Sequence, residues 1–473
     1  MDSIQIKQTS GNQTALEVSA VETLAASMRG ALLKPGDEGY DEARTIWNAM
    51  IDRRPALIAR CTGTADIQAV VKFAAQHNLL TSVKGGGHNI AGNAVCDGGL
   101  MIDLSLLKTV RVDPTAKLAH VGPAATLGDV DHECQAFGLA LPTGINSTTG
   151  IAGLTLGGGF GWLSRKYGMT IDALTAVDII TPDGTFRRAS ADENADLFWA
   201  VRGGGGSFGV VTRFEFKLNP VGPEVLAGLI VMKLADAKNA MQQYRELCKN
   251  LSDETCVWIV LRKAPPLPFL PEEVHGQEVI VFAFCHIGDK AEGEKAIAPI
   301  RSFGKVVGEF VGPMPFAGWQ TAFDPLLTPG ARNYWKSHNF LDIPDELIDI
   351  VIDYTNKLPS PQCEIFFAQL GGQTSRIAKD ATAYPHRDAN FVCNVHGRWD
   401  SAAEDEKGIG WSREFFNAST PFATGGVYIN FMTEEETDRV GLAFGSSMER
   451  LIEIKKKYDP NNLFRMNQNV KPA

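Results

Sequence analysis

Three glycines followed by a histidine form the segment of this sequence that points most directly to chemistry. An apolar stretch ends at Lys84 and continues into Gly85, Gly86, Gly87 and then His88. Consecutive glycines that leave a strand can turn several backbone N–H groups toward one anion, such as a pyrophosphate. The histidine would then lie beside whatever the pyrophosphate carries. A tight turn with an unrelated histidine would explain these residues as well, because short glycine patterns are weak signals.

Two further glycine clusters follow, at residues 150–161 and 203–206. A region that repeatedly needs bare backbone is one where the backbone closely contacts another group. A nicotinamide dinucleotide fingerprint explains them poorly, because it belongs between the first strand and first helix, with an acidic residue about 20 positions later. Here Asp172 follows a polar loop instead. A purely structural glycine loop would leave the earlier loop at residues 85–87 unexplained.

The order of these motifs resembles the FAD-linked oxidases of the vanillyl-alcohol-oxidase superfamily, which share a PCMH-type FAD-binding domain. The ending resembles the berberine-bridge-enzyme-like branch, of the 6-hydroxy-D-nicotine oxidase type. The similarity extends from Arg54 to Lys471. It is carried by KGGGH (84–88), LPTGINSTTGIAGLTLGGGFGWLSRKYGMTIDAL (141–174), VDIITPDG (177–184), FWAVRGGGGSFGVVT (198–212), YIN (428–430) and YDPNNLFRMNQN (458–469).

The resemblance implies an FAD cofactor that is bonded covalently through His88 to the 8α-methyl carbon of the flavin. This chemistry is reasonable, since neutral imidazole is a good nucleophile near pH 7. The family's FAD-binding motifs fall on Lys84, Gly85, Gly86, Gly87, His88, Asn89, Gly92, Gly144, Asn146, Thr148, Gly150, Ile151, Gly153, Gly157, Gly161, Trp162, Gly209, Val211, Tyr428 and Asn467.

The sequence departs from the family pattern at three positions. Many relatives add a second covalent link through a Gly-x-Cys motif, but Asn146 stands at the cysteine position, so we expect a single bond. Sugar-oxidising relatives place a tyrosine base where this chain has Phe431, which cannot remove a proton. Valine near flavin C4a favours oxygen use in this branch. The bulkier Ile151 indicates slow oxygen use and another electron acceptor.

Four polar side chains are candidate catalytic residues. Tyr428 carries a phenol, and Asn430 would share its face if residues 425–431 form a strand. Gln369 and Asn394 lie in apolar strand patterns, where an unpaired polar side chain costs free energy and often marks a pocket. A packed aromatic ring for Tyr428, and solvent or backbone partners for the other two, would explain them without catalysis.

The function that the resemblance implies is an FAD-dependent oxidoreductase. Hydride would pass from a small organic substrate to the covalently bound flavin, and oxygen or another acceptor would reoxidise it. Two alternatives stay open: a sugar or alcohol oxidase of the same family, and a non-catalytic flavin-binding scaffold, which the phenylalanine at position 431 would suit. An NAD-dependent dehydrogenase is a third and weaker interpretation.

The elements that must position these residues indicate an α+β protein with two domains. The glycine clusters place a PCMH-type FAD-binding domain in residues 1–220 and 425–473. Residues 221–424 alternate helical patterns with apolar strands, which predicts a substrate-binding domain with an antiparallel sheet covered by helices. Smaller expectations are a helix capped by Thr64 or Asp66 and a hairpin that turns at Pro182-Asp183-Gly184.

Charge and composition exclude several classes of partner. The net charge of −10 argues against nucleic acid and anionic membranes. The N-terminus lacks the features of a signal peptide, and we expect a cytoplasmic protein, monomeric or homodimeric. The eight cysteines are widely spaced without a C-x-x-C pair, so buried free thiols are expected and a metal site is not.

Overall fold

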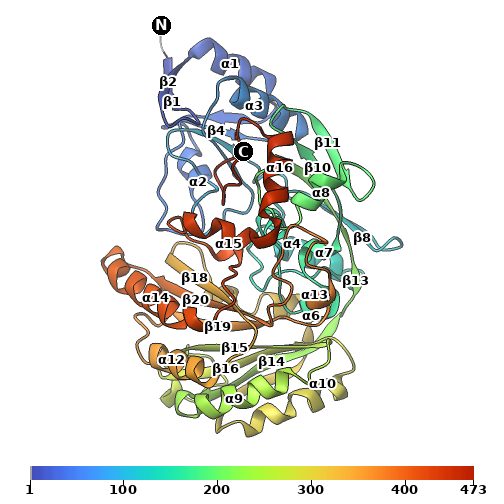
Figure 1. Ribbon diagram of the computed structural model, residues 1–473, viewed down its shortest axis with the longest axis vertical. Helices are drawn as coiled ribbons and strands as arrows, with labels where there is room; N and C mark the ends of the chain where they lie inside the picture. The colour runs from blue at the N-terminus through green and yellow to red at the C-terminus, as the bar shows by residue number, and fades with distance from the viewer. Residues whose placement is uncertain (1–2, 473) are drawn as a thin grey trace.

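Five sheets organise the chain in the computed structural model, which describes residues 3–472 (Figure 1). Near the N-terminus, a four-stranded sheet has the order β3-β4-β6-β5, with β4 and β5 parallel to β6. Its strand β5 ends at Lys84 and delivers the chain into the triple-glycine loop. The elements of this part are β1 (Ser3–Lys7), β2 (Gln13–Glu17), α1 (Val18–Ser27), β3 (Ala31–Leu33), α2 (Tyr40–Arg44), β4 (Leu57–Arg60), α3 (Thr64–Gln76), β5 (Thr81–Lys84) and β6 (Leu100–Asp103).

A five-stranded sheet, in the order β11-β10-β12-β8-β7, follows it. The predicted hairpin is confirmed, because β10 and β11 pair antiparallel around a turn closed by a 2.8 Å bond from Gly184 N–H to Thr181 O. The elements are β7 (Val110–Asp113), β8 (Leu118–Val121), α4 (Leu127–Gln135), β9 (Leu139–Ala140), α5 (Ile151–Leu156), α6 (Ser164–Tyr167), α7 (Thr170–Ala173), β10 (Leu174–Ile180), β11 (Phe186–Ser190), α8 (Ala195–Ala200), β12 (Val210–Lys217) and β13 (Asn219–Pro220).

A seven-stranded antiparallel sheet, in the order β17-β14-β16-β15-β19-β20-β18, forms the lower half of the molecule in Figure 1. Apolar side chains of α9, α12 and α14 cover one face, which confirms the expected α+β architecture. The elements are β14 (Glu224–Lys233), α9 (Ala237–Cys248), β15 (Thr255–Lys263), β16 (Glu278–His286), α10 (Lys290–Ile297), β17 (Val306–Pro315), α11 (Phe316–Gln320), β18 (Arg332–Phe340), α12 (Asp345–Thr355), β19 (Glu364–Gln369), α13 (Gln373–Arg376), β20 (Phe391–Trp399) and α14 (Asp405–Ser419).

The last part of the chain returns to the glycine-rich half, where α16 (Met448–Tyr458) lies beside α8 (Figure 1). The fully buried Lys455 fixes this return. Its Nζ lies 2.6 Å from Asp459 Oδ2 and donates to the carbonyls of Ser207 and Phe464. The C-terminal tail is therefore tied to the chain directly after the third glycine cluster. The other short helix of this part is α15 (Val440–Phe444).

Two local predictions are wrong. Residues 425–431 form no strand; the chain makes a 3₁₀ turn, Ile429–Phe431, because the side chains of Tyr428 and Asn430 bond to the second glycine cluster. The N-cap of α3 is Gly63, without a side-chain cap. The carboxylate of Asp66 instead accepts backbone N–H groups from residues 29, 30 and 62.

Single-turn 3₁₀ helices complete the described structure, and they lie at Leu234–Asp236, Glu272–Val274, Ala298–Ser302, Asp324–Leu326, Ala402–Glu404, Thr420–Phe422, Ile429–Phe431, Thr437–Arg439 and Gly445–Ser447. The eight cysteines are free thiols, and seven of them are buried. Within residues 3–472, no helix combines the length and apolar character that crossing a membrane requires. The large sheet takes all its strands from residues 224–399, while the domain boundaries themselves stay a prediction.

Candidate active site

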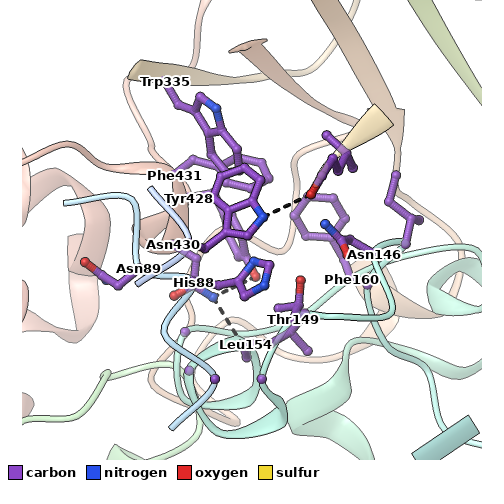
Figure 2. A pocket seen from close by; sticks show the side chains of 18 of the residues that line it. His88, Asn89, Asn146, Thr149, Leu154, Phe160, Trp335, Tyr428, Asn430 and Phe431 are labelled. Atoms are coloured by element: carbon purple, nitrogen blue, oxygen red, sulfur yellow. Dashed lines mark hydrogen bonds between the residues drawn. The ribbon is translucent and has the colours of Figure 1, made fainter. Parts of the chain in front are cut away.

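A cavity of about 380 Å³ lies between the glycine clusters and the face of the seven-stranded sheet that faces away from α9, α12 and α14 (Figure 2). All three clusters contribute bare backbone to its wall, at residues 85–87, 150–157 and 205–209. The strands β14, β15, β16, β18, β19 and β20 contribute side chains from the other side. Segments that are far apart in sequence therefore meet around one enclosed space.

The first two glycine clusters touch each other directly. A β-carbon on Gly86 would lie 2.5 Å from Gly150 Cα, and one on Gly150 would lie 2.6 Å from Gly86 N. Both positions need glycine because the two backbones are in contact. Gly153 and Gly206 line the cavity for another reason, since a β-carbon at either would meet no protein atom within 4 Å. The backbone there faces open space that a bound molecule can fill.

His88 lies in the cavity wall with one ring nitrogen already engaged. Its ring stacks on Trp47, with centroids 5.1 Å apart, and its Nε2 lies 3.1 Å from Thr148 Oγ1. The Thr148 hydroxyl donates to Asn146 Oδ1 at 2.8 Å, so its oxygen is left to accept the Nε2–H of His88. Nδ1 of His88 then carries the free lone pair. Burial lowers the pKa of His88 to about 4, so the imidazole is neutral at pH 7.

Tyr428 and Asn430 join the C-terminal turn to the second glycine cluster (Figure 2). The Tyr428 hydroxyl accepts the Gly159 N–H at 2.9 Å and the Asn430 Nδ2–H at 3.1 Å. Nδ2 of Asn430 also donates to Leu154 O at 3.2 Å. Burial raises the pKa of Tyr428 to about 12, so the phenol keeps its proton at neutral pH.

The two candidates from the large sheet lie in different places. Gln369 shares the helix-covered face with Ile365 and Phe367, and its Oε1 accepts the Val257 N–H at 3.0 Å. The Gln369 side chain thus bonds to the backbone of β15 and does not line the cavity. Asn394 lies on the opposite face of the sheet. His396 lies on the same face of β20 and lines the cavity. Both polar atoms of the Asn394 side chain are buried and have no hydrogen-bond partner among residues 3–472.

Sequence and structure comparisons identify the family. Residues 55–190 match the FAD binding domain model, and residues 427–471 match the model described as berberine and berberine like. An FAD-linked oxidoreductase of Dictyostelium discoideum is 30% identical over 467 residues, which cover 98% of this chain and 99% of that protein. The chain belongs to the berberine-like family of FAD-linked oxidoreductases.

Two further relatives show how widely this family's substrates vary. The crystal structure of 6-hydroxy-D-nicotine oxidase from Arthrobacter nicotinovorans matches with a TM-score of 0.85 and 28% identity, covering 94% of this chain and 99% of that one. A chitooligosaccharide oxidase of Gibberella zeae is 30% identical over 467 residues, covering 92% of this chain and 91% of that protein. At this level of identity, the comparisons support the FAD cofactor of this oxidoreductase but do not define its substrate.

The glycine-lined cavity fits FAD, because the open positions at Gly153 and Gly206 leave room against bare backbone. The sequence-predicted residues that line the cavity are Gly85, Gly86, Gly87, His88, Asn89, Gly144, Asn146, Gly150, Gly153, Gly157, Trp162, Gly209, Val211, Tyr428, Asn430 and Asn467. Thr148 does not line the cavity itself but contacts it indirectly, through its hydrogen bond with His88.

Four predicted cofactor residues support the cavity from outside. The Lys84 ammonium donates to the carbonyls of Ala43 and Thr45, behind the glycine loop. Ile151 is fully buried in the hydrophobic core. An oxygen gate would need its side chain at the cavity surface, and the side chain is not placed there. Gly92 packs against Ile51, and a β-carbon on Gly161 would lie 2.0 Å from the carbonyl oxygen of residue 143.

A polar cluster on the large sheet is formed by Arg262, Glu364 and His396. The sequence pattern places His396 on the same strand face as Asn394, but sequence reasoning missed Arg262 and Glu364. Arg262 Nη1 lies 2.7 Å from Glu364 Oε2, and His396 Nδ1 lies 3.4 Å from Glu364 Oε1. One signal was available, because Glu364 shares a strand face with Phe366, and Arg262 shares one with Val260, within otherwise apolar strands. Trp47 and Trp335, which also line the cavity, gave no comparable signal.

Proposed function

We propose that this FAD-linked oxidoreductase holds FAD through one covalent bond, from His88 Nδ1 to the flavin 8α carbon, and oxidises a small organic substrate. The observation that carries the proposal is the neutral His88 ring, held at the cavity wall with Nε2 engaged by Thr148. Nucleophilic attack needs an unprotonated nitrogen. Nδ1 meets that requirement at physiological pH.

Residues 146 and 148 set the state of this histidine. The amide oxygen of Asn146 accepts both the backbone N–H and the hydroxyl of Thr148, at 3.1 and 2.8 Å. The threonine oxygen is thereby oriented as an acceptor toward Nε2, which fixes the tautomer. Stacking on Trp47 holds the plane of the ring.

The side chains around the cavity support a single covalent bond. Asn146, at the position where relatives carry cysteine, ends in an amide that is not a nucleophile. No cysteine of the described residues lines the cavity. Bound FAD supplies the hydride acceptor and passes the electrons on to oxygen or another acceptor.

The chain's own residues would position the substrate and exclude water. Phe431 and Phe160 pack their rings 6.0 Å apart, and the ring of Tyr428 lies 4.9 Å from Phe431 (Figure 2). Because the Tyr428 hydroxyl accepts two N–H groups, its own proton is free to be donated to a bound molecule. Tyr428 is therefore a hydrogen-bond donor in this proposal, not the base.

Acid denaturation of the purified holoenzyme tests the proposal. Covalent FAD stays in the protein pellet and gives a fluorescent band on a denaturing gel, whereas the supernatant stays colourless. His88→Ala should retain the fold, measured by circular dichroism, and release its flavin on acid treatment. Release of all flavin from the wild-type protein would contradict the covalent bond.

A further inference from the structure

The sheet side of the cavity is largely apolar, and its polar groups are the Arg262–Glu364–His396 cluster and the indole N–H groups of Trp258 and Trp335. The strands β14, β15 and β16, together with the loop at residues 264–270, supply the apolar wall. Its principal side chains are Leu229, Val231, Val260, Val279, Val281 and Leu267. A sugar would bring several hydroxyl groups against this wall, and each would lose its water without gaining a partner. The wall suits a largely apolar molecule with one polar end.

The polar cluster lies on the cavity side that leads to the flavin attachment site. His396 contacts Trp335 edge-on at a centroid distance of 4.5 Å. Trp335 in turn lies 5.7 Å from Trp47, which stacks on His88. An unbroken row of aromatic rings therefore connects His396 with the residue that would hold FAD.

His396 lies between two oxygen acceptors. Its Nε2 lies 3.3 Å from Asn333 Oδ1, and the other amide atom of Asn333 donates to Ala331 O at 2.8 Å, which fixes the oxygen as the acceptor. Its Nδ1 lies 3.4 Å from Glu364 Oε1. A neutral imidazole has one N–H, so one of the two oxygens faces a lone pair. The ring gains a second favourable contact when it takes up a proton.

The surrounding charges keep His396 ready to accept that proton. Burial, together with Arg262 and Arg398, lowers the pKa of His396, while Glu364 raises it, and the ring is neutral near pH 7. Burial opposes the charge of Glu364, but Arg262 and His396 outweigh it and hold the pKa of Glu364 below its usual value. The side chains of Glu364 and His396 are 12% and 4% exposed, so the pair is shielded from bulk water.

We propose that the substrate is an apolar alcohol or amine, and that His396 accepts the proton of its O–H or N–H group as hydride leaves the adjacent carbon. The hydrogen of the C–H bond would leave with both bonding electrons as hydride, for which bound FAD would be the acceptor. The O–H or N–H electron pair forms the C=O or C=N bond of the product, and the proton goes to the unprotonated ring nitrogen of His396. This inference rests on the FAD chemistry proposed above. The carboxylate of Glu364 stabilises the imidazolium that forms.

Binding of unreactive probes to the holoenzyme tests the substrate class. We would titrate 4-propylphenol, its methyl ether 4-propylanisole, and cellobiose, and follow the absorbance of the bound flavin. We expect the phenol to bind about tenfold more tightly than the ether, which lacks the donor, and both to bind more tightly than cellobiose. Equal binding of phenol and ether, or tighter binding of cellobiose, would overturn the inference.

Two variants test the assignment to the cluster. His396→Ala should abolish the preference for the phenol over the ether, because the acceptor is removed. Glu364→Gln should weaken the preference, because the imidazole remains but the carboxylate that favours its protonation is lost. Glu278→Gln is the matched control, since Glu278 also lies on the large sheet, in a half-exposed pair 3.8 Å from Lys263, outside the cavity wall. Retention of the full preference in His396→Ala would contradict the role of His396.

The pH dependence of anaerobic flavin bleaching tests the proton transfer. With an apolar alcohol or amine, the wild-type rate should fall as the pH falls through the pKa of His396, and His396→Ala should be slow and lose that fall. An unchanged pH profile in His396→Ala would overturn the assignment. Flavin retained in the denatured variant shows that the covalent link is intact. A failure of the inference is thereby distinguished from a failure of the proposed function.

Discussion

The hydroxyl oxygen of Thr148 lies 3.1 Å from Nε2 of His88, on the side of the ring that faces Asn146. The contact joins the residues just before the second glycine cluster to the histidine that follows the first. Its consequence is chemical, because it assigns the imidazole proton to Nε2 and leaves the lone pair on Nδ1, which is the nucleophile that we propose. If the flavin is attached as proposed, Asn146 would contribute to attachment by orienting the Thr148 hydroxyl.

Thr148→Val should slow flavin attachment. The substitution keeps the side-chain shape and removes the oxygen that orients His88. The loss of a hydrogen bond worth about 1 kcal/mol corresponds to a rate about fivefold lower. The measurement is the covalent flavin fraction against time after FAD is added to apoprotein. Thr149→Val serves as the control, since no hydrogen bond joins the hydroxyl of Thr149 to His88. Equal rates in wild type and Thr148→Val would refute the orienting role.

The pH dependence of flavin attachment should follow the pKa of His88, which burial lowers to about 4. Only the neutral ring attacks, so the attachment rate should be flat from pH 8 to about pH 5 and fall as the pH drops through about 4. An unperturbed histidine would instead lose reactivity below about pH 6.5. Incorporation rates in a series of buffers distinguish the two curves.

Gly153→Leu should prevent FAD binding without unfolding the protein. A β-carbon at this position meets no protein atom within 4 Å, so the leucine side chain would occupy cavity space. Gly410→Leu is a matched control, because Gly410 is also a helical glycine whose β-carbon would be unobstructed, but it lies in α14 away from the cavity. Flavin content and circular dichroism are the measurements. Normal flavin content in Gly153→Leu would place FAD elsewhere.

Lys455→Met should destabilise the protein by about 3–5 kcal/mol, because it leaves the carboxylate of Asp459 buried without its partner. Lys457, two residues after Lys455, forms an exposed ion pair with Asp196. Lys457→Met breaks this pair and should lower the free energy of unfolding by at most about 1 kcal/mol. Urea unfolding of both variants gives the comparison. Similar losses in the two variants would show that the buried pair does not fix the C-terminal return.

The sequence predicts the cofactor half of the cavity better than its substrate half. Glycines that two backbones need for contact leave a visible pattern, as at Gly86 and Gly150, so the positions lining that wall could be found. Strand periodicity says which residues share a face but not which face is inward. For that reason the sequence favours Gln369, although it faces the helices, and does not indicate that Arg262 and Glu364 face the cavity.

The turn at residues 428–431 shows a second limit. Its alternating pattern favours a strand, but tertiary hydrogen bonds decide the conformation, because the Tyr428 hydroxyl and the Asn430 amide bond to Gly159 and Leu154. Such contacts join residues more than 250 positions apart and leave no local trace in the sequence. The sequence predicts only that Tyr428 and Asn430 share a strand face, whereas the structure joins their side chains by a hydrogen bond across a 3₁₀ turn.

Mass spectrometry of the His88 peptide tests the central claim most directly. The denatured holoenzyme is digested with protease, and the peptide that contains residues 85–88 is isolated and fragmented. Our account predicts that this peptide carries the mass of one FAD, with the added mass on the histidine, and that no cysteine-containing peptide carries any. An unmodified His88 peptide from protein that still contains FAD would contradict it.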